Sequence, residues 1–160
     1  MNKKLIHDKI IEILEEAHQG ATDAALQAHD TATNKESVAE NKYDTFGLEA
    51  SYLAYGQAKR VAEYEEALVA YKSLGVIDFS ADLSIALGSL IQLEDEEGIT
   101  QYLFLGPSAG GLKFFFEGKE ITLITTSSPL GKVLNARYVG DEVEMQLSDQ
   151  NKSYGIVAIA

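Results

Sequence analysis

The chain has 160 residues, of which 24% are charged and 46% are apolar, a balance typical of a folded globular protein. Its 13 basic and 25 acidic residues give a net charge of −12. This charge argues against a protein that binds nucleic acid mainly through the phosphate backbone. The absence of cysteine excludes disulfides, thiolate metal sites and cysteine nucleophiles. No apolar run reaches the roughly 20 residues that cross a bilayer, and charges interrupt the N-terminal one, unlike in a signal peptide. We therefore expect a soluble, cytoplasmic protein with no membrane partner.

Residues 3–30 and 37–74 are predicted to form two helices that pair as an antiparallel coiled-coil hairpin. Ala, Leu, Glu and Gln, which favour helices, are common in both segments, and the first proline is Pro107. The polar connection between the segments is short, as in a helical hairpin. Apolar residues recur at spacings of three and four, as a coiled-coil seam requires. The expected seams are Ile6, Ile10, Ile13, Ala17, Gly20 and Ala24 in the first helix, and Ala50, Ala54, Gln57, Val61, Tyr64, Leu68 and Tyr71 in the second.

The seam residues become smaller toward the connection between the helices. Isoleucine and leucine lie near residues 10 and 68, whereas alanine, glycine and threonine dominate near 20–33 and 47–54. Small residues bury little apolar area, so the hairpin should be firm at its base and weaker at its tip, near residues 30–44. About 30 helical residues span roughly 45 Å. We expect an arm of this length to project from the rest of the chain; the alternative is a hairpin folded flat against it.

From residue 76 onward the pattern changes to short apolar runs that glycines separate. These runs predict a small antiparallel sheet with one short helix, so that the chain is α+β, with an arm over 1–75 and a sheet domain over 76–160. Ser128 and Pro129 fit the N-cap and first position of that helix, predicted over 128–134. The strands are expected at 84–93, 99–105, 112–116, 120–125, 142–147 and 154–159.

Three motifs in this second half carry a family resemblance. They are ITTSSPLG at 124–131, VGDEVE at 139–144 and YGIVAI at 154–159, and ENKY at 40–43 adds an acidic tip to the arm. In order and spacing they resemble the Gre family (GreA/GreB type) of bacterial transcription elongation factors. The resemblance covers residues 75–160 closely and the arm more loosely, which identifies the chain as a divergent member. It implies an FKBP-like fold for the sheet domain.

The resemblance implies a partner, RNA polymerase, and a protein that is not itself an enzyme. The sheet domain would dock at the rim of the polymerase's secondary channel, with Ser127, Ser128, Pro129, Leu130 and Asp141 as candidate contacts. The arm would enter that channel as part of a monomer, and nucleic acid would be met only through the polymerase complex. No intrinsic cofactor is implied. The tip acids would share a catalytic Mg²⁺ with the polymerase, whose own active site cleaves backtracked RNA.

The candidate tip acids are Glu36, Glu40 and Asp44, with Glu36 and Glu40 as the metal ligands. The family usually has an Asp and a Glu three residues apart. Here two glutamates are four apart, which still places both carboxylates on one helical face with Asp44 beside them. Carboxylate oxygens suit Mg²⁺. Thr33-x-x-Glu36 and Ser37-x-x-Glu40 also fit capping boxes, in which the glutamates only start a helix, and a channel binder that does not promote cleavage therefore stays open.

Other functions and residues remain to be weighed. An FKBP-like sheet could host peptidyl-prolyl isomerase or chaperone activity, and the arm could instead be a homotypic coiled coil.

His7, His18 and His29 recur every eleven residues and are expected on the surface. The strip Tyr52, Tyr55, Tyr64 and Tyr71 is expected to pack across the arm, with a partner surface as the alternative. In Phe114–Phe116, one face of a strand must present an aromatic ring, in a buried strand or a contact patch.

Overall fold

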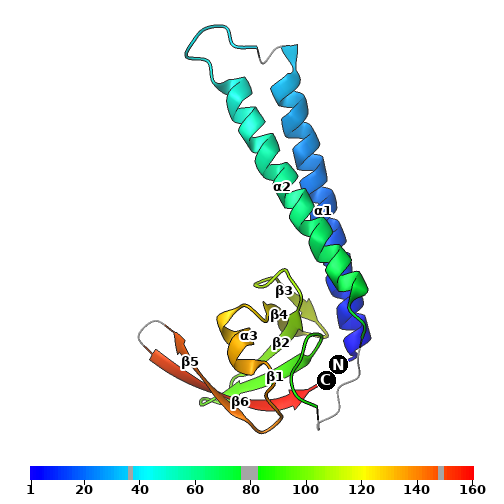
Figure 1. Cartoon of the computed structure of the whole chain (residues 1–160), viewed down its shortest axis with the longest axis vertical. Coiled ribbons are helices and arrows are strands. Elements are labelled where there is room, and N and C mark those ends of the chain that lie inside the picture. The colour runs from blue at the N-terminus through cyan, green and yellow to red at the C-terminus, as the bar shows by residue number, and fades with distance from the viewer. Residues whose placement is uncertain (36–37, 77–82, 148–149) are drawn as a thin grey trace. The chain divides into compact units, whose positions relative to one another are not determined.

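The computed structural model describes residues 1–35, 38–76, 83–147 and 150–160, and these contain three helices and six strands (Figure 1). By internal contacts the chain divides into a hairpin unit, residues 9–69, and a sheet unit, residues 1–8 with 70–160. The boundary expected between residues 75 and 76 lies just before residues 77–82, which lie outside the described residues. In the described part of the chain, no helix is both long and apolar enough to cross a membrane.

The two predicted helices are present as α1 (Lys3–Thr33) and α2 (Phe46–Ser73), which lie side by side and antiparallel (Figure 1). All seven seam residues predicted for α2 are at least partly buried, so this prediction is confirmed. In α1 five of the six predicted seam residues are at least partly buried, and the prediction is wrong at Gly20, which is exposed, whereas Leu14 and Ala21 are 0% and 8% exposed. A straight helix drifts from a strict 3.5-residue repeat, and here the drift moves the buried stripe one position along.

The hairpin unit packs more tightly at one end than at the other. Near its base Ile10 and Leu14 are fully buried and Ala67 is 4% exposed. Toward the tip the helices leave a hollow of about 430 Å³, lined by Ala24, Gln27, Ala28, Thr31, Phe46, Glu49, Ala50, Leu53 and Gln57. The alanines are too small to fill the space between the helices. This hollow agrees with the predicted weakness of the distal half, which stays a prediction.

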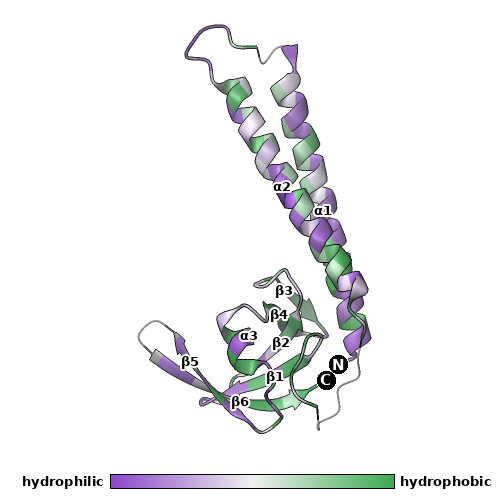
Figure 2. Cartoon of the chain, in the orientation of Figure 1, coloured by the Kyte–Doolittle hydropathy of each residue, from purple (hydrophilic) through white to green (hydrophobic). Residues whose placement is uncertain are grey.

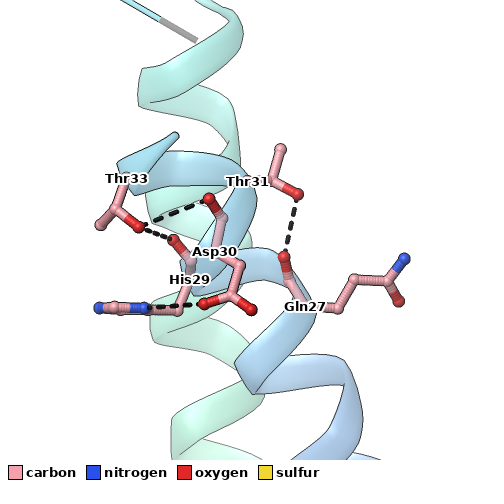
Figure 3. Close-up of polar contacts among 5 residues, drawn as sticks. All are labelled: Gln27, His29, Asp30, Thr31 and Thr33. Atoms are coloured by element: carbon pink, nitrogen blue, oxygen red, sulfur yellow. Dashed lines mark hydrogen bonds and ion pairs between the residues drawn. The ribbon is translucent and has the colours of Figure 1, made fainter. Parts of the chain in front are cut away.

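Two threonine hydroxyls bond backbone carbonyls near the end of α1 (Figure 3). The hydroxyls of Thr31 and Thr33 donate to the carbonyl oxygens of Gln27 and His29, at 2.9 Å in both cases. Thr33 also donates to the carbonyl oxygen of Asp30 at 3.4 Å. Inside an α-helix each carbonyl accepts the N–H four residues further on, so the hydroxyls add a second hydrogen bond to the Gln27 and His29 carbonyls, which the helix already satisfies. The helix extends three residues beyond the predicted end at residue 30.

The sheet unit contains one six-stranded sheet in the order β3-β4-β2-β1-β6-β5. Five neighbouring pairs form it, of which β2 and β4 are parallel and the others antiparallel. The predicted sheet is thus present, but it is mixed rather than purely antiparallel, because β4 inserts between β2 and the edge strand β3. The strands are β1 (Leu90–Asp95), β2 (Thr100–Gly106), β3 (Lys113–Phe116), β4 (Lys119–Thr125), β5 (Glu142–Leu147) and β6 (Gln150–Ile159).

One face of the sheet is covered by α3 (Pro129–Leu134), the predicted short helix. Leu134 is fully buried, and Leu130 and Val133 pack against the same core. The pleat of β3 buries Phe114 and leaves Phe115 70% exposed, as a strand's alternation requires. The buried core beneath α3 is Ile85, Ile91, Leu93, Leu103, Leu105, Ile124, Leu134, Val143, Tyr154, Ile156 and Ile159.

The first turns of α1 and the last turn of α2 belong to the sheet unit, where Tyr71 anchors them. Tyr71 is fully buried, and its hydroxyl donates to the carbonyl oxygen of Ser108 at 3.0 Å. A Cβ on Gly106 would collide with the Tyr71 ring, so glycine permits this close approach. His7 was expected at the surface but is 6% exposed, because its Nε2 donates to the Tyr71 carbonyl oxygen at 2.8 Å and satisfies a helix-end acceptor.

Candidate functional site

The tip of the hairpin between α1 and α2 is a loop over residues 38–45, not the start of the second helix as predicted. Asp44 organises this loop. One oxygen of its carboxylate accepts the backbone N–H of Glu40 and the other accepts that of Phe46, both at 3.2 Å. Phe46 is the first residue of α2, whose early N–H groups lack helical partners and attract negative charge. Asp44 therefore stabilises the start of α2 and the loop before it.

Neighbouring polar side chains hold the same loop in turns. The side-chain oxygen of Asn41 accepts the Tyr43 N–H at 2.9 Å, and its carbonyl accepts the Asp44 N–H at 3.1 Å. The Thr45 hydroxyl donates to the Glu49 carboxylate at 2.8 Å. Asparagine, aspartate and threonine compete with helical hydrogen bonding in this way, which explains why α2 starts nine residues later than predicted.

The three candidate tip acids have different positions. Glu40 is exposed, and Asp44 is half-buried with both oxygens engaged. Glu36 and Ser37 lie outside the described residues, and so do the two capping boxes that include them. The expectation that Glu40 and Asp44 share a helical face is wrong, because the segment between them is not helical.

The described tip acids can be tested as ligands of a magnesium ion. Within the described ranges, no three His, Asp, Glu or Cys side chains gather as a metal site. Glu40 presents an exposed carboxylate, the hard oxygen ligand that Mg²⁺ prefers. Asp44 accepts one backbone N–H on each oxygen, which leaves a lone pair on both oxygens but holds the carboxylate against the loop backbone. Of the two acids in the described loop, Glu40 is therefore the one whose carboxylate is exposed to solvent.

The candidate docking residues of the sheet unit surround the start of α3. Ser128 is its N-cap: the hydroxyl donates to the Thr125 carbonyl oxygen at 2.7 Å and accepts the Gly131 N–H at 3.1 Å. The predicted cap is thus confirmed. Ser127 and Pro129 are exposed, whereas Leu130 is partly buried against the core. Ser127 and Pro129 are the members of this group that a partner can reach most fully.

Asp141, the remaining candidate contact, closes a turn before β5. Its carboxylate accepts the Tyr138 N–H at 2.9 Å, and its own N–H donates to the Tyr138 carbonyl oxygen at 3.1 Å. Gly140 precedes it with φ of 91°, a left-handed conformation that glycine adopts without strain. Asp141 thus has a structural role in the turn, and its contact with a partner stays a prediction.

Exposed aromatic residues on the hairpin were assigned only in part from the sequence. Tyr64 and Tyr71 pack as expected, but Tyr52 and Tyr55 are 70% and 75% exposed. Tyr43, in the tip loop, is 79% exposed. The exposure of Tyr52 and Tyr55 could have been predicted from the seam. A buried stripe through Ala50, Ala54 and Gln57 leaves both tyrosines on the outer face of the helix.

No family model matches the chain, and no curated protein sequence matches it. Among solved structures, the chain is similar to the GreA factor homolog 1 (Gfh1) of Thermus thermophilus, at 23% identity over 96% of this chain and 92% of that chain, with a TM-score of 0.39. Thermus aquaticus Gfh1 is 22% identical over 92% of each chain, with a TM-score of 0.41. The transcription elongation factor GreA/GreB from Nitrosomonas europaea is 16% identical over 60% of this chain and 78% of that chain, with a TM-score of 0.35. The names of all three proteins refer to Gre factors.

Proposed function

We propose that the chain is a transcription elongation regulator that binds RNA polymerase and inserts its helical hairpin into the secondary channel. The observation that supports this most is the pairing of two features in one chain. One is a helical hairpin whose tip loop carries acids, and the other is a sheet unit with the Gre-type motifs at the start of α3 and before β5. In this proposal the protein acts in the cytoplasm as a monomer, and it meets nucleic acid only through the polymerase.

The two units have separate roles in the proposed function. Ser127 and Pro129 are exposed at the start of α3 and would contact the rim of the channel. The hairpin would carry the tip loop inward. A chain with a net charge of −12 is repelled by nucleic acid and attracted to a basic channel wall, which favours this partner over free RNA or DNA.

The state of the tip acids favours a regulator that occupies the channel without strongly promoting RNA cleavage. A Mg²⁺ ion shared with the polymerase would polarise phosphate oxygens and activate water. In the described loop Glu40 would supply one ligand, while Asp44 holds the backbone instead. We propose that the chain has no enzymatic activity and binds no cofactor of its own. Asp44 then positions the loop, and within the described loop Glu40 is the acid presented to the polymerase.

Binding and cleavage are tested by separate measurements. Co-purification of the full chain with core RNA polymerase at low salt should give a complex, and no complex at low salt would refute the proposal. In halted elongation complexes, the chain should compete with a cleavage factor and shorten RNA weakly by itself. Rapid shortening that Glu40→Gln abolishes would contradict the non-cleaving mode while leaving channel binding intact.

The isomerase alternative has little support in the sheet unit. Leu130, Val133 and Leu134 fill the space between α3 and the sheet with the chain's own side chains. A prolyl ring would have to displace part of that core. A proline-isomerisation assay on a short peptide should therefore give the uncatalysed rate, and a clear acceleration would revive this alternative.

A further inference from the structure

The segment that contains α3 is locally basic in an acidic chain. Residues 121–140 contain no Asp or Glu, although the chain has 25 acidic residues among its 160, and they contain Lys132 and Arg137. Both side chains are exposed, and neither forms an ion pair with another described residue. In Figure 2 α3 shows purple beside green, because its polar residues alternate with residues that enter the core. Two cations without a counter-charge, in a chain of net charge −12, indicate a place where another molecule supplies the negative charge.

The Arg137 guanidinium is held at the end of α3. Its Nε donates to the carbonyl oxygen of Val133 at 3.4 Å, and Val133 follows Lys132 directly in the helix. A guanidinium has five N–H donors, and in the described part of the chain only the one on Nε is used. The terminal nitrogens of Arg137 and the Lys132 ammonium therefore keep their donors for carboxylate oxygens, with which they form strong hydrogen bonds.

The backbone beneath these side chains is fixed by the core of the sheet unit. The Ile85 N–H donates to the Arg137 carbonyl oxygen at 2.7 Å, and the Ala136 N–H donates to the Ile85 carbonyl oxygen at 2.8 Å. Ile85 is itself buried in the core. The next residue, Tyr138, donates its N–H to the Asp141 carboxylate at 2.9 Å. A surface that is already held in this way loses little conformational freedom when a partner binds, which favours affinity.

Exposed apolar side chains lie next to the two cations in the sequence. Tyr138 and Val139 follow the arginine directly and are 51% and 36% exposed. The acids that come next point elsewhere or are engaged. The Asp141 carboxylate accepts the Tyr138 N–H. Glu142 lies on the sheet face away from α3, because Val143, the next residue of β5, is buried in the core beneath α3 and side chains alternate along a strand.

We propose that an acidic protein segment with apolar side chains of its own binds this surface. The surface, called the α3 surface below, consists of Lys132, Arg137, Tyr138 and Val139. The inference rests on the proposed function, in which RNA polymerase supplies the segment, and it adds the chemistry of the contact. Carboxylates of the segment pair with the two cations, and its apolar side chains cover Tyr138 and Val139. The two units of the chain would then meet opposite charges, the sheet unit an acidic rim and the hairpin a basic channel wall.

A nucleic acid is the other polyanion that two cations could contact. Binding through the phosphate backbone needs several Lys and Arg residues that displace counterions together. The α3 surface offers two, and the net charge of −12 on the whole chain repels a long polyanion. An exposed tyrosine and valine beside the cations match the mixed polar and apolar composition of a protein interface. The observations therefore favour a protein segment over RNA or DNA.

Carbodiimide crosslinking tests the chemistry of the contact, because this reagent joins a lysine amine only to a carboxylate that it touches. In the complex with core RNA polymerase, Lys132 should couple to Asp or Glu residues of one polymerase segment at least about tenfold more than Lys119 does. Lys119 is the matched control, an exposed lysine of the same unit whose ammonium lies over the Tyr102 ring. Equal coupling of both lysines, or a formed complex in which Lys132 does not couple, would overturn the inference.

Charge reversal tests the contribution of the surface to affinity. Lys132→Glu combined with Arg137→Glu should weaken binding of the full chain to core RNA polymerase at least about tenfold at low salt, and the difference should narrow as salt is raised. Lys113→Glu combined with Lys119→Glu changes the net charge equally elsewhere on the sheet unit and should weaken binding less than about threefold. Equal losses in the two double variants would assign the effect to net charge and overturn the inference.

A conservative variant separates charge from structure at Arg137. Arg137→Lys keeps the positive charge and removes the hydrogen bond to the Val133 carbonyl oxygen. It should bind the polymerase within about threefold of the native chain. A loss as large as that of Arg137→Glu would show that Arg137 acts by holding the end of α3, which would overturn its place in the α3 surface.

The choice of complex separates this inference from nucleic-acid binding and from the proposed function. The loss caused by Lys132→Glu with Arg137→Glu should be the same for core polymerase free of nucleic acid and for an elongation complex. A loss confined to the elongation complex would identify nucleic acid as the partner and overturn the inference. If the native chain binds the polymerase and the double variant binds equally well, this inference alone fails. If the native chain forms no complex, the proposed function fails and the inference falls with it.

Discussion

Removing the Tyr71 side chain tests how the helix ends are fixed in the sheet unit. Tyr71 is fully buried, its ring lies over Gly106, and its ring centroid is 6.4 Å from that of Phe104. Truncation of a buried aromatic residue costs about 3–5 kcal/mol. Tyr71→Phe keeps the ring and removes only the hydroxyl that donates to Ser108, which costs about 1 kcal/mol. We therefore expect the loss of unfolding free energy in Tyr71→Ala to be about three to five times the loss in Tyr71→Phe.

The hydroxyl also predicts a dependence on alkaline pH. Burial raises the pKa of Tyr71 above its usual value near 10. The folded state then keeps a proton that the unfolded state loses, so stability from this group is complete below about pH 10 and decreases as the pH rises. The stability advantage of the native chain over Tyr71→Phe, about 1 kcal/mol at neutral pH, should fall by up to about 1.4 kcal/mol per pH unit above pH 10 and reverse its sign near pH 11. Groups that titrate equally in both proteins cancel from this difference.

Urea unfolding followed by near-ultraviolet circular dichroism, from pH 8 to 11, provides the measurement. Tyr64→Phe is the matched control, because Tyr64 is only partly buried in the hairpin seam; its cost should stay within about 0.5 kcal/mol. If Tyr71→Phe is as damaging as Tyr71→Ala, or if its difference from the native chain is constant up to pH 11, the inferred role of the Tyr71 hydroxyl is wrong.

Three further predictions concern the hairpin. Asp44→Ala removes the acceptor for two backbone N–H groups and should cost about 1 kcal/mol, with faster proteolysis within residues 38–45 as the readout; unchanged proteolysis would contradict its loop-holding role. Ala50→Leu adds apolar volume to the hollow of about 430 Å³ and should raise hairpin stability by about 1–2 kcal/mol, measured by thermal melting; a lower melting temperature would show that the hollow cannot accept the side chain. Gly56→Ala should stabilise the helix by about 0.5–1 kcal/mol in thermal melting, because a Cβ meets nothing there; an unchanged or lower melting temperature would contradict this.

The hairpin could be predicted in outline because its signal is a repeat that many residues share. The α2 seam is correct at every predicted position, since errors at single residues average out over seven positions in about six turns. The start of α2 could not be predicted from that repeat. It depends on Asn41 and Asp44, whose side chains bind backbone groups a few residues away and replace helical hydrogen bonds with turns.

The sheet unit shows the same contrast between local and long-range signals. The cap at Ser128 and Pro129 was predictable, because capping depends on adjacent residues. The parallel pairing of β2 and β4 was not, since strand order depends on contacts between distant segments. The burial of His7 was also missed, because its partner is the carbonyl of Tyr71, 64 residues further along the chain. The polarity of His7 and its spacing in the sequence, taken alone, predict a surface position.

A cleavage probe on the tip gives the most direct test of the proposed function. The cysteine-free chain allows a single hydroxyl-radical probe at Tyr43→Cys, in the tip loop, where the native side chain is 79% exposed. In complex with RNA polymerase, this probe should cut the polymerase segments that line its catalytic centre, and the same probe at Val69→Cys should not. Cuts confined to the outer surface of the polymerase, or identical cuts from both positions, would contradict insertion of the hairpin into the channel.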